Sequence, residues 1–128
     1  MAKITPIPTD SELEILQLLW QNGPSTVRFV NEELNKLKEV GYTTTLKLMQ
    51  IMLEKGILIR NDESRTHIYT SAISEDAAQK KLLDKFMDAT FRGSAMKLVT
   101  QALGSGKTSQ QELDEIKKLI EQLEGGIK

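Results

Sequence analysis

The chain has 128 residues, a formal net charge of −1 and no cysteine, and 39% of its residues are hydrophobic and 27% charged. This composition is typical of a soluble globular protein with one ordinary domain, or a small domain with an appendage. The absence of cysteine excludes disulfides and thiolate metal sites, and with a single histidine we expect no metal and no cofactor. No apolar run reaches the length of a membrane span or a signal peptide, so we expect a cytoplasmic protein without membrane insertion.

Two helices are predicted before residue 38. Thr9 and Glu12 form a capping box that opens a helix to about Gln21. Its apolar stripe comprises Leu13, Ile15, Leu16, Leu18, Leu19 and Trp20. The sequence Asn-Gly-Pro at 22–24 breaks this helix, and Ser25 or Thr26 caps a second one that runs to about residue 37. Its inward side chains are expected to be Val27, Val30, Leu34 and Leu37.

The stretch 42–60, YTTTLKLMQIMLEKGILIR, is the centre of the chain's organisation. Its apolar residues recur mostly at spacings of three and four, which predicts a helix; they are Leu46, Leu48, Met49, Met52 and Leu53. Thr43 and Thr44 are candidates to cap its start, and Gly56 is placed to end it in a left-handed conformation. Residues 57–60 read as a short buried strand.

A polar tip at 61–65 and an alternating return strand at 67–72 complete a β-hairpin. Three helices followed by a hairpin predict a winged helix-turn-helix, in which the third helix enters a groove of DNA. The outward residues that would reach base edges are Thr43, Thr44, Lys47 and Gln50, and Arg60 and Arg65 beside the tip would contact phosphates. Two plainer alternatives stay open: an amphipathic helix with a hairpin often has no nucleic-acid role, and the two arginines could simply solvate the hairpin.

Charge is distributed unevenly along this region. Residues 36–67 carry six basic and four acidic side chains, a net of +2, whereas residues 9–34 carry five acids and one arginine, a net of −4. The part expected to face DNA is therefore the less acidic part, which favours a modest and salt-sensitive binder.

A domain boundary is predicted near Ile73, giving a DNA-binding domain at 1–73 and a helical dimerisation domain at 74–128. Ser74 opens one helix, a second follows the bend at 92–94, and a capping box of Ser109 and Glu112 opens the last. The intervening 104–108, GSGKT, lacks the earlier glycine of a phosphate-binding loop and reads as a flexible linker.

These three helices carry more apolar side chains than so short a segment can bury alone, which predicts that two copies interleave as a dimer. The residues expected at that interface are Leu82, Phe86, Phe91, Met96, Leu98, Val99, Leu113, Ile116 and Ile120. A ligand pocket lined by phenylalanine and methionine is the alternative, although no convergent polar groups accompany it.

Four segments, taken in this order and spacing, resemble the penicillinase-repressor family (BlaI/MecI/CopY type): TDSELEILQLLW, TTTLKLMQIMLEKGILIR, HIYTSAISED and RGSAMKLVTQAL. The resemblance implies a winged helix, a C-terminal dimerisation domain and a homodimeric repressor on palindromic double-stranded operator DNA. Family members control genes for β-lactamase, an altered penicillin-binding protein or copper transport. Copper sensing through the cysteine-rich motif of that branch is excluded here, because the chain has no cysteine.

In the antibiotic-responsive branch, a membrane sensor-protease pathway leads to cleavage of the repressor in its dimerisation domain. The bond that matches the family's cleavage site joins Gln101 to Ala102, where the family has asparagine and phenylalanine. Gln50 and Ile51 stand where family members often carry arginine, so the base sequence that is read is expected to differ.

We therefore expect a homodimeric transcriptional repressor. The alternative is a winged-helix module that binds protein without sequence-specific DNA binding, which the negative net charge favours. An enzyme is not expected, since no nucleophile with a base, no paired carboxylates, no complete phosphate loop and no metal cluster is visible.

Overall fold

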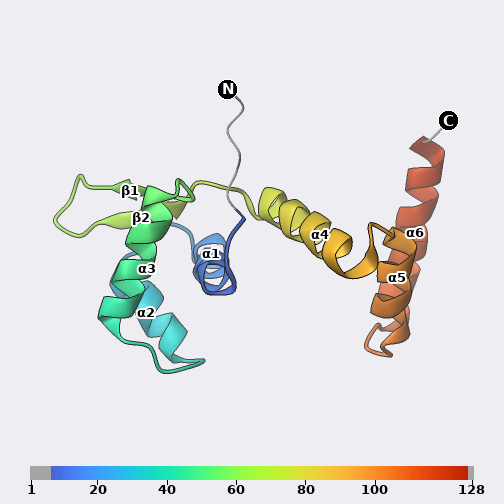
Figure 1. Cartoon of the computed structure of the whole chain (residues 1–128), viewed down its shortest axis with the longest axis horizontal. Helices are drawn as coiled ribbons and strands as arrows, with labels where there is room; N and C mark the ends of the chain where they lie inside the picture. Colours follow the sequence, from blue (N-terminus) through green and yellow to red (C-terminus); the bar gives the residue numbers. More distant parts are fainter. Residues whose placement is uncertain (1–6, 127–128) are drawn as a thin grey trace. The chain divides into compact units, whose positions relative to one another are not determined.

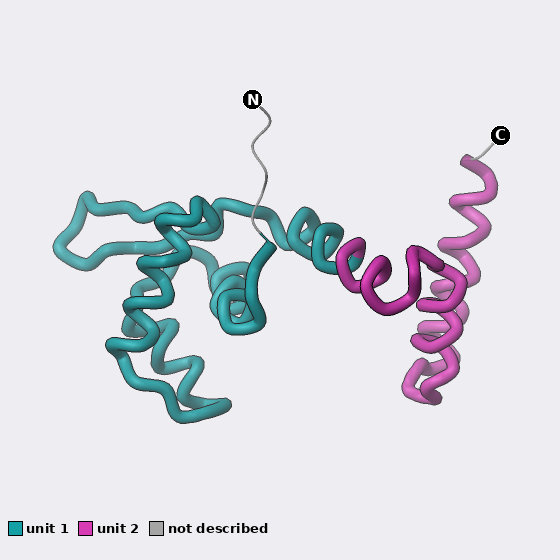
Figure 2. Tube along the Cα trace, viewed as in Figure 1, with its two compact units in different colours: residues 1–83 teal, residues 84–128 magenta. Residues whose placement is uncertain are grey.

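The computed structural model describes residues 7–126. Within them, three helices precede a β-hairpin and three helices follow it (Figure 1). These elements are α1 (Asp10–Asn22), α2 (Val27–Asn35), α3 (Tyr42–Glu54), β1 (Leu58–Asn61), β2 (Ile68–Ser71), α4 (Glu75–Phe91), α5 (Ala95–Gly104) and α6 (Gln110–Gly126). The chain divides into two compact units, 1–83 and 84–128, and the division falls inside α4 (Figure 2). The mainly helical fold with a small hairpin is as predicted.

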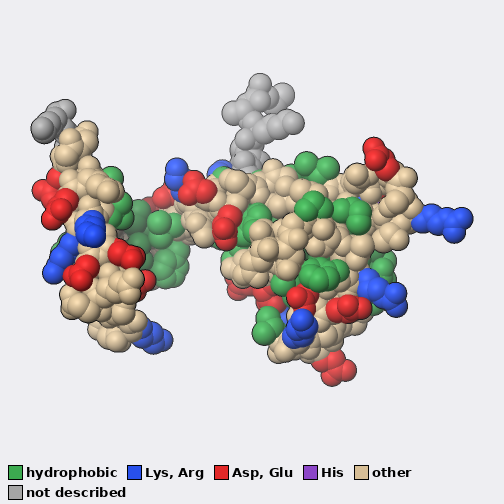
Figure 3. All heavy atoms as spheres, turned by 180° about the vertical axis from the view of Figure 1, so that it is seen from behind, with side chains coloured by type: hydrophobic (Ala, Val, Ile, Leu, Met, Phe, Trp, Pro, Cys, Tyr) green, Lys and Arg blue, Asp and Glu red, His purple; other side chains and the backbone are tan. Residues whose placement is uncertain are grey.

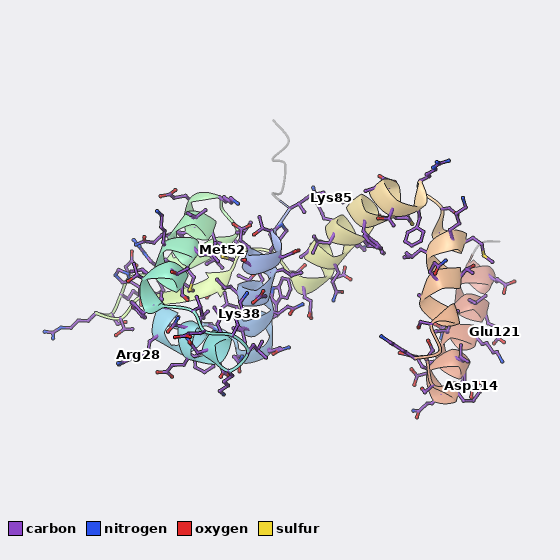
Figure 4. All side chains as sticks on the ribbon, turned by 60° about the horizontal axis from the view of Figure 1, so that its bottom comes forward. Arg28, Lys38, Met52, Lys85, Asp114 and Glu121 are labelled. Carbon is purple, nitrogen blue, oxygen red and sulfur yellow. The ribbon has the colours of Figure 1, made fainter. Side chains whose placement is uncertain are left out.

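The first unit is built on one hydrophobic core to which α1, α2, α3 and the hairpin all contribute. Its buried side chains are Ile15, Leu16, Leu19, Val27, Val30, Leu34, Met49, Met52, Ile57, Leu58 and Tyr69. Met52 is fully buried and points from α3 into this unit (Figure 4). Trp20 packs against the core and donates its indole N–H to Ser71 Oγ and to the Ile73 carbonyl, each at 3.1 Å. These contacts fasten α1 to the end of the hairpin.

Side chains cap the first two helices. The Thr9 hydroxyl accepts from the Glu12 N–H at 3.3 Å and the Glu12 carboxylate accepts from the Thr9 N–H at 2.9 Å, which confirms the predicted capping box. Thr26, one of the two predicted candidates, caps α2 by accepting from the Phe29 N–H at 3.1 Å. Ser25 has a different role: its N–H donates to the Tyr69 carbonyl and its carbonyl accepts from the Tyr69 N–H, an isolated antiparallel bridge on the edge of β2 that does not face β1.

The hairpin is antiparallel, with Leu58 opposite Ser71 and Asn61 opposite Ile68. Its first strand begins one residue later than predicted. Gly56 adopts a φ of 83° after α3, and the Ile57 N–H turns back to the Met52 carbonyl at 3.1 Å. This closure of the helix end uses the donor that Ile57 would otherwise give to a strand.

Two local predictions were wrong. Leu37 was expected inside but is 82% exposed, because α2 ends at Asn35 and the chain turns away. Thr43 and Thr44 were expected to cap α3, but the helix already begins at Tyr42 behind Gly41, with no side-chain cap. Both threonines are therefore helical residues whose side chains are exposed.

The second unit hides little of its apolar surface. Ser94 caps α5 by accepting from the Lys97 N–H at 3.2 Å, and Ser109 accepts from the Glu112 N–H at the start of α6 at 3.1 Å. Arg92 and Gly93, both with positive φ, form the turn between α4 and α5. No residue of α5 or α6 is buried.

Candidate nucleic-acid interface

The outer face of α3 is polar and its inner face is apolar. Thr43, Thr44, Lys47 and Gln50 are all exposed, as predicted from their spacing, whereas the face formed by residues 45, 49 and 52 is buried. A shallow hollow beside α1 brings Thr43, Thr44 and Lys47 together, and its floor includes Leu48 and Ile51. Gln50 lies one turn beyond Lys47, so hydrogen-bonding side chains extend over two turns of the exposed surface.

The wing is the hairpin tip, residues 62–67. Of the two predicted arginines, Arg65 lies on the wing and Arg60 lies on β1 just before it. Arg60 is half-buried, and its Nε lies 2.7 Å from Asp62 Oδ1. A hydrogen bond with Tyr69 and the nearby Asp62 carboxylate raise the pKa of Arg60, so it stays a cation. Arg65 is exposed and forms no ion pair with any residue of the described range. Of the two, Arg65 is the more available to an incoming anion.

A cleft that the sequence did not reveal lies between the first turn of α2, the start of α3 and the wing. Arg28, Tyr42, Arg65 and His67 all line it. The Arg28 side chain is 84% exposed at the outside of α2 (Figure 4) and forms an ion pair with Glu32 at 3.9 Å. Arg28 falls in the acidic window of the sequence, so only the fold shows that it joins Arg65 beside α3.

The far end of α3 is fixed to α1 by a buried carboxylate. Glu12 is only 1% exposed, and its Oε2 accepts from Lys55 Nζ at 2.8 Å. Burial acts to raise the pKa of Glu12, but hydrogen bonds from Lys55 and from the Thr9 N–H outweigh burial, and the pKa ends below its ordinary value. Glu12 is therefore ionised at neutral pH and holds the C-terminal end of α3 against α1.

The residues predicted for dimerisation remain largely uncovered within the second unit and the adjoining part of α4. Phe86 is 51% exposed, Met96 75%, Val99 43% and Ile120 50%; the other five, Leu82, Phe91, Leu98, Leu113 and Ile116, are half-buried. Phe86 and Phe91 form an edge-to-face pair with ring centroids 5.6 Å apart. Hydrophobic side chains reach the surface as green spheres in Figure 3. Gln101 and Ala102 are exposed within α5.

Residues 7–126 contain neither a candidate membrane span nor a candidate metal site. No helix in that range has the length and apolar character needed to cross a bilayer. No three histidine or acidic side chains in the described part of the chain are grouped so as to hold a metal ion.

The profile of the penicillinase repressor family matches residues 8–122, and so spans the winged helix and nearly all of the helices after it. The chain belongs to the penicillinase-repressor family. It is similar to a penicillinase repressor of Bacillus licheniformis, with 25% identity over 122 residues that make up 95% of this chain and 94% of the relative. A transcriptional regulator BlaI of Mycobacterium tuberculosis is 27% identical over 128 residues, covering 98% of this chain and 91% of the relative. The relatives are named as repressors and regulators, not as enzymes.

Two solved structures resemble the winged helix. The DNA-binding domain of the repressor BlaI aligns with a TM-score of 0.51 and 28% identity, over 58% of this chain and 90% of that one. Bacillus licheniformis BlaI, solved as a monomer in complex with the blaP half-operator, aligns with the same score and identity over 59% of this chain and 92% of that one. The predicted winged helix and the predicted family are thereby confirmed.

Proposed function

We propose that this chain is a transcriptional repressor that binds palindromic operator DNA as a homodimer. Helix α3 enters the major groove, and Thr43, Thr44, Lys47 and Gln50 face the base edges. The wing lies along the backbone, where Arg60 and Arg65 contact phosphates. One observation carries the proposal: the outer face of α3 is polar and exposed. The similar winged helix of Bacillus licheniformis BlaI was solved in complex with the blaP half-operator.

Electrostatics support this placement. Arg28 and Arg65 line one cleft beside the start of α3, so positive charge flanks the helix although the chain as a whole carries −1. Phosphate contacts depend on local charge, and each one makes binding more sensitive to salt. Because Arg60 is already paired with Asp62, we expect Arg65 to contribute more to affinity than Arg60.

The homodimer is proposed from the uncovered apolar side chains after residue 81. Neither α5 nor α6 contains a buried residue, and Met96, Phe86 and Ile120 are at least half exposed. Fully burying a side chain of this size is worth about 1.5–3 kcal/mol, so a second copy that covers several of them gains substantial stability. A dimer also carries two copies of α3, which suits two half-sites related by a twofold axis. In this proposal residues 1–73 form the DNA-binding domain and residues 74–128 form the dimerisation domain.

A gel-shift titration tests this function. A duplex from the region upstream of the chain's own gene is compared with a duplex of the same length and composition but scrambled sequence. We expect tighter binding to the upstream duplex and weakening of both as salt rises. A module that binds only protein would shift neither duplex.

We extend the proposal to inactivation by proteolysis, set off by a membrane sensor-protease pathway. The bond between Gln101 and Ala102 lies within α5, and a protease needs an extended segment, so cleavage requires α5 to open locally. Mass spectrometry of the chain from β-lactam-treated cells should detect a fragment that ends at Gln101. An intact chain during full derepression would contradict this part of the proposal and leave DNA binding untouched.

A further inference from the structure

We infer that Asn31 and Thr45 position α3 for reading DNA, and that the hydrogen bond between them is a determinant of sequence specificity. The inference rests on the proposed function and goes beyond it, because neither residue is expected to touch DNA. Asn31 lies on α2, and Thr45 lies in the first turns of α3 on its buried face. The pair therefore joins the two helices of the helix-turn-helix.

The Asn31 amide makes two contacts that bridge the turn and the helix. Its Nδ2 donates to Thr45 Oγ1 at 2.9 Å and to the Val40 carbonyl at 3.1 Å. An asparagine NH₂ group has two hydrogens, so both are used. Asn35, one turn further along α2, donates to the same Val40 carbonyl at 2.8 Å and accepts from the Val40 N–H at 3.2 Å. Only Asn31 reaches α3 itself.

This bridge matters because, within residues 7–126, no other side-chain hydrogen bond restrains the start of α3. Its N-cap is Gly41, which offers no side chain to the free N–H groups of the first turn. Thr45 is fully buried, and within residues 7–126 the one hydrogen-bond partner of its hydroxyl is the Asn31 amide. Thr45 has no accessible surface, so its hydroxyl is shielded from water in the intact chain.

The bond to Thr45 sets the rotation of α3 about its axis. Thr44 and Lys47 lie on the opposite, exposed side of the same turns. Side chains of a helix reach about 5–6 Å from its axis, so a rotation of about 10° moves a rim side chain by about 1 Å. Recognition groups must be held to within about 0.5 Å of their working geometry. Phosphate contacts by long, flexible basic side chains tolerate the same displacement far better.

The test compares variants of the full chain on the upstream duplex and on a scrambled duplex, by fluorescence anisotropy. Thr45→Val keeps the shape of the side chain and removes only the hydroxyl, so the fold is retained. We expect the ratio of the two affinities to fall about tenfold, which corresponds to losing one good base contact. Affinity for the scrambled duplex should stay within about twofold, and Thr45→Ser should restore the ratio.

Two further variants act as controls. Asn31→Ala removes both bonds and should lower the ratio at least as much as Thr45→Val. Asn35→Ala removes an asparagine from the same helix that uses the same Val40 carbonyl, but its bonds are exposed and water can replace them. For Asn35→Ala, the ratio of the affinities for the upstream and scrambled duplexes should change less than about twofold. Trp20 fluorescence, from the only tryptophan of the chain, sets a temperature at which all variants are folded.

Amide hydrogen exchange supplies a readout that needs no DNA. In Thr45→Val, exchange should accelerate at residues 42–46 and stay unchanged in α1. The inference would be overturned if Thr45→Val left the affinity ratio unchanged, whether it kept both affinities or weakened both equally. The inference would also be overturned if Asn35→Ala lowered the affinity ratio as much as Asn31→Ala does. The bonds to the Val40 carbonyl in the turn, and not the bond to Thr45, would then fix the orientation of α3. A wild-type chain with no preference for the upstream duplex would instead refute the proposed function.

Discussion

Replacing Lys55 by methionine should destabilise the first unit in a way that depends on pH. Lys55 Nζ lies 2.8 Å from Glu12 Oε2, and the two side chains are 40% and 2% exposed. Breaking a fully buried ion pair by removing one partner costs about 3–5 kcal/mol, whereas exposed pairs contribute about 0–1 kcal/mol. Since solvent screens the lysine but not the carboxylate, we expect a loss of about 1–3 kcal/mol at pH 7.

The pH dependence follows from the pKa of Glu12, which is lowered in the folded chain. A carboxyl group whose folded pKa lies below its unfolded value stabilises the fold above the unfolded pKa, about 4.3 for glutamate. That contribution is lost as the pH falls through the folded pKa. Replacing Lys55 removes its hydrogen bond and its charge, two of the causes that lower the pKa of Glu12. The deficit of Lys55→Met relative to wild type should therefore be largest at neutral pH and shrink below about pH 4.

The assay is thermal unfolding of the full chain followed by Trp20 fluorescence, which reports on the first unit alone. For a domain of 60–100 residues each 1 kcal/mol shifts Tm by about 4–8 °C, so a loss of about 1–3 kcal/mol should lower the Tm of the variant by about 4–24 °C at pH 7. Lys38→Met is the matched control, because Lys38 pairs with Glu14 at 3.0 Å but both side chains are solvated. Lys38→Met should lower the free energy of unfolding by less than about 1 kcal/mol. A Lys55→Met deficit that is the same at pH 3 and pH 7 would refute the ion-pair explanation.

Three further predictions concern α3 and the wing. Asp62→Asn should release Arg60 from its 2.7 Å ion pair and strengthen binding to upstream and scrambled DNA alike, with a steeper salt dependence; weaker binding would contradict this placement of the wing. Gln50→Ala should cost about 1–3 kcal/mol on the upstream duplex and little on the scrambled one in anisotropy titrations. Gly56→Ala should lower the free energy of unfolding by about 1–2 kcal/mol in urea titrations, because a φ of 83° strains any Cβ even where no atom lies within 4 Å. An unchanged urea midpoint would show that the helix end relaxes without cost.

Local signals in the sequence were sufficient for most of the fold. The Thr9 and Glu12 capping box, the helical spacing of Met49 and Met52, and the Gly56 stop each depend on residues within a few positions. Such patterns can be read without knowing what packs against them. They predicted the three helices and the hairpin to within a few residues, and placed the exposed side chains of α3 correctly.

Contacts between distant residues could not be read in this way. Glu12 appeared only as a capping residue, yet it pairs with Lys55 43 positions later. Arg28 was counted in an acidic window, yet it lines a cleft with Arg65. Thr45 is polar, yet its spacing of four and seven to Met49 and Met52 places it on the buried face. A polar residue inside an apolar stripe is a signal that asks for a partner, but the sequence does not say that Asn31 supplies it.

The proposed homodimeric repressor is tested most directly by the stoichiometry of the full chain on its upstream DNA, measured by analytical ultracentrifugation beside a chain truncated to residues 1–73. We expect the full chain to sediment as a dimer at micromolar concentration and to place two copies on one palindromic duplex. The truncated chain should be monomeric and bind the same duplex far more weakly, because the linked second half-site is lost. A full-length chain that sediments as a monomer, and yet binds that duplex far more tightly than residues 1–73 do, would show that dimerisation is not what gives the affinity.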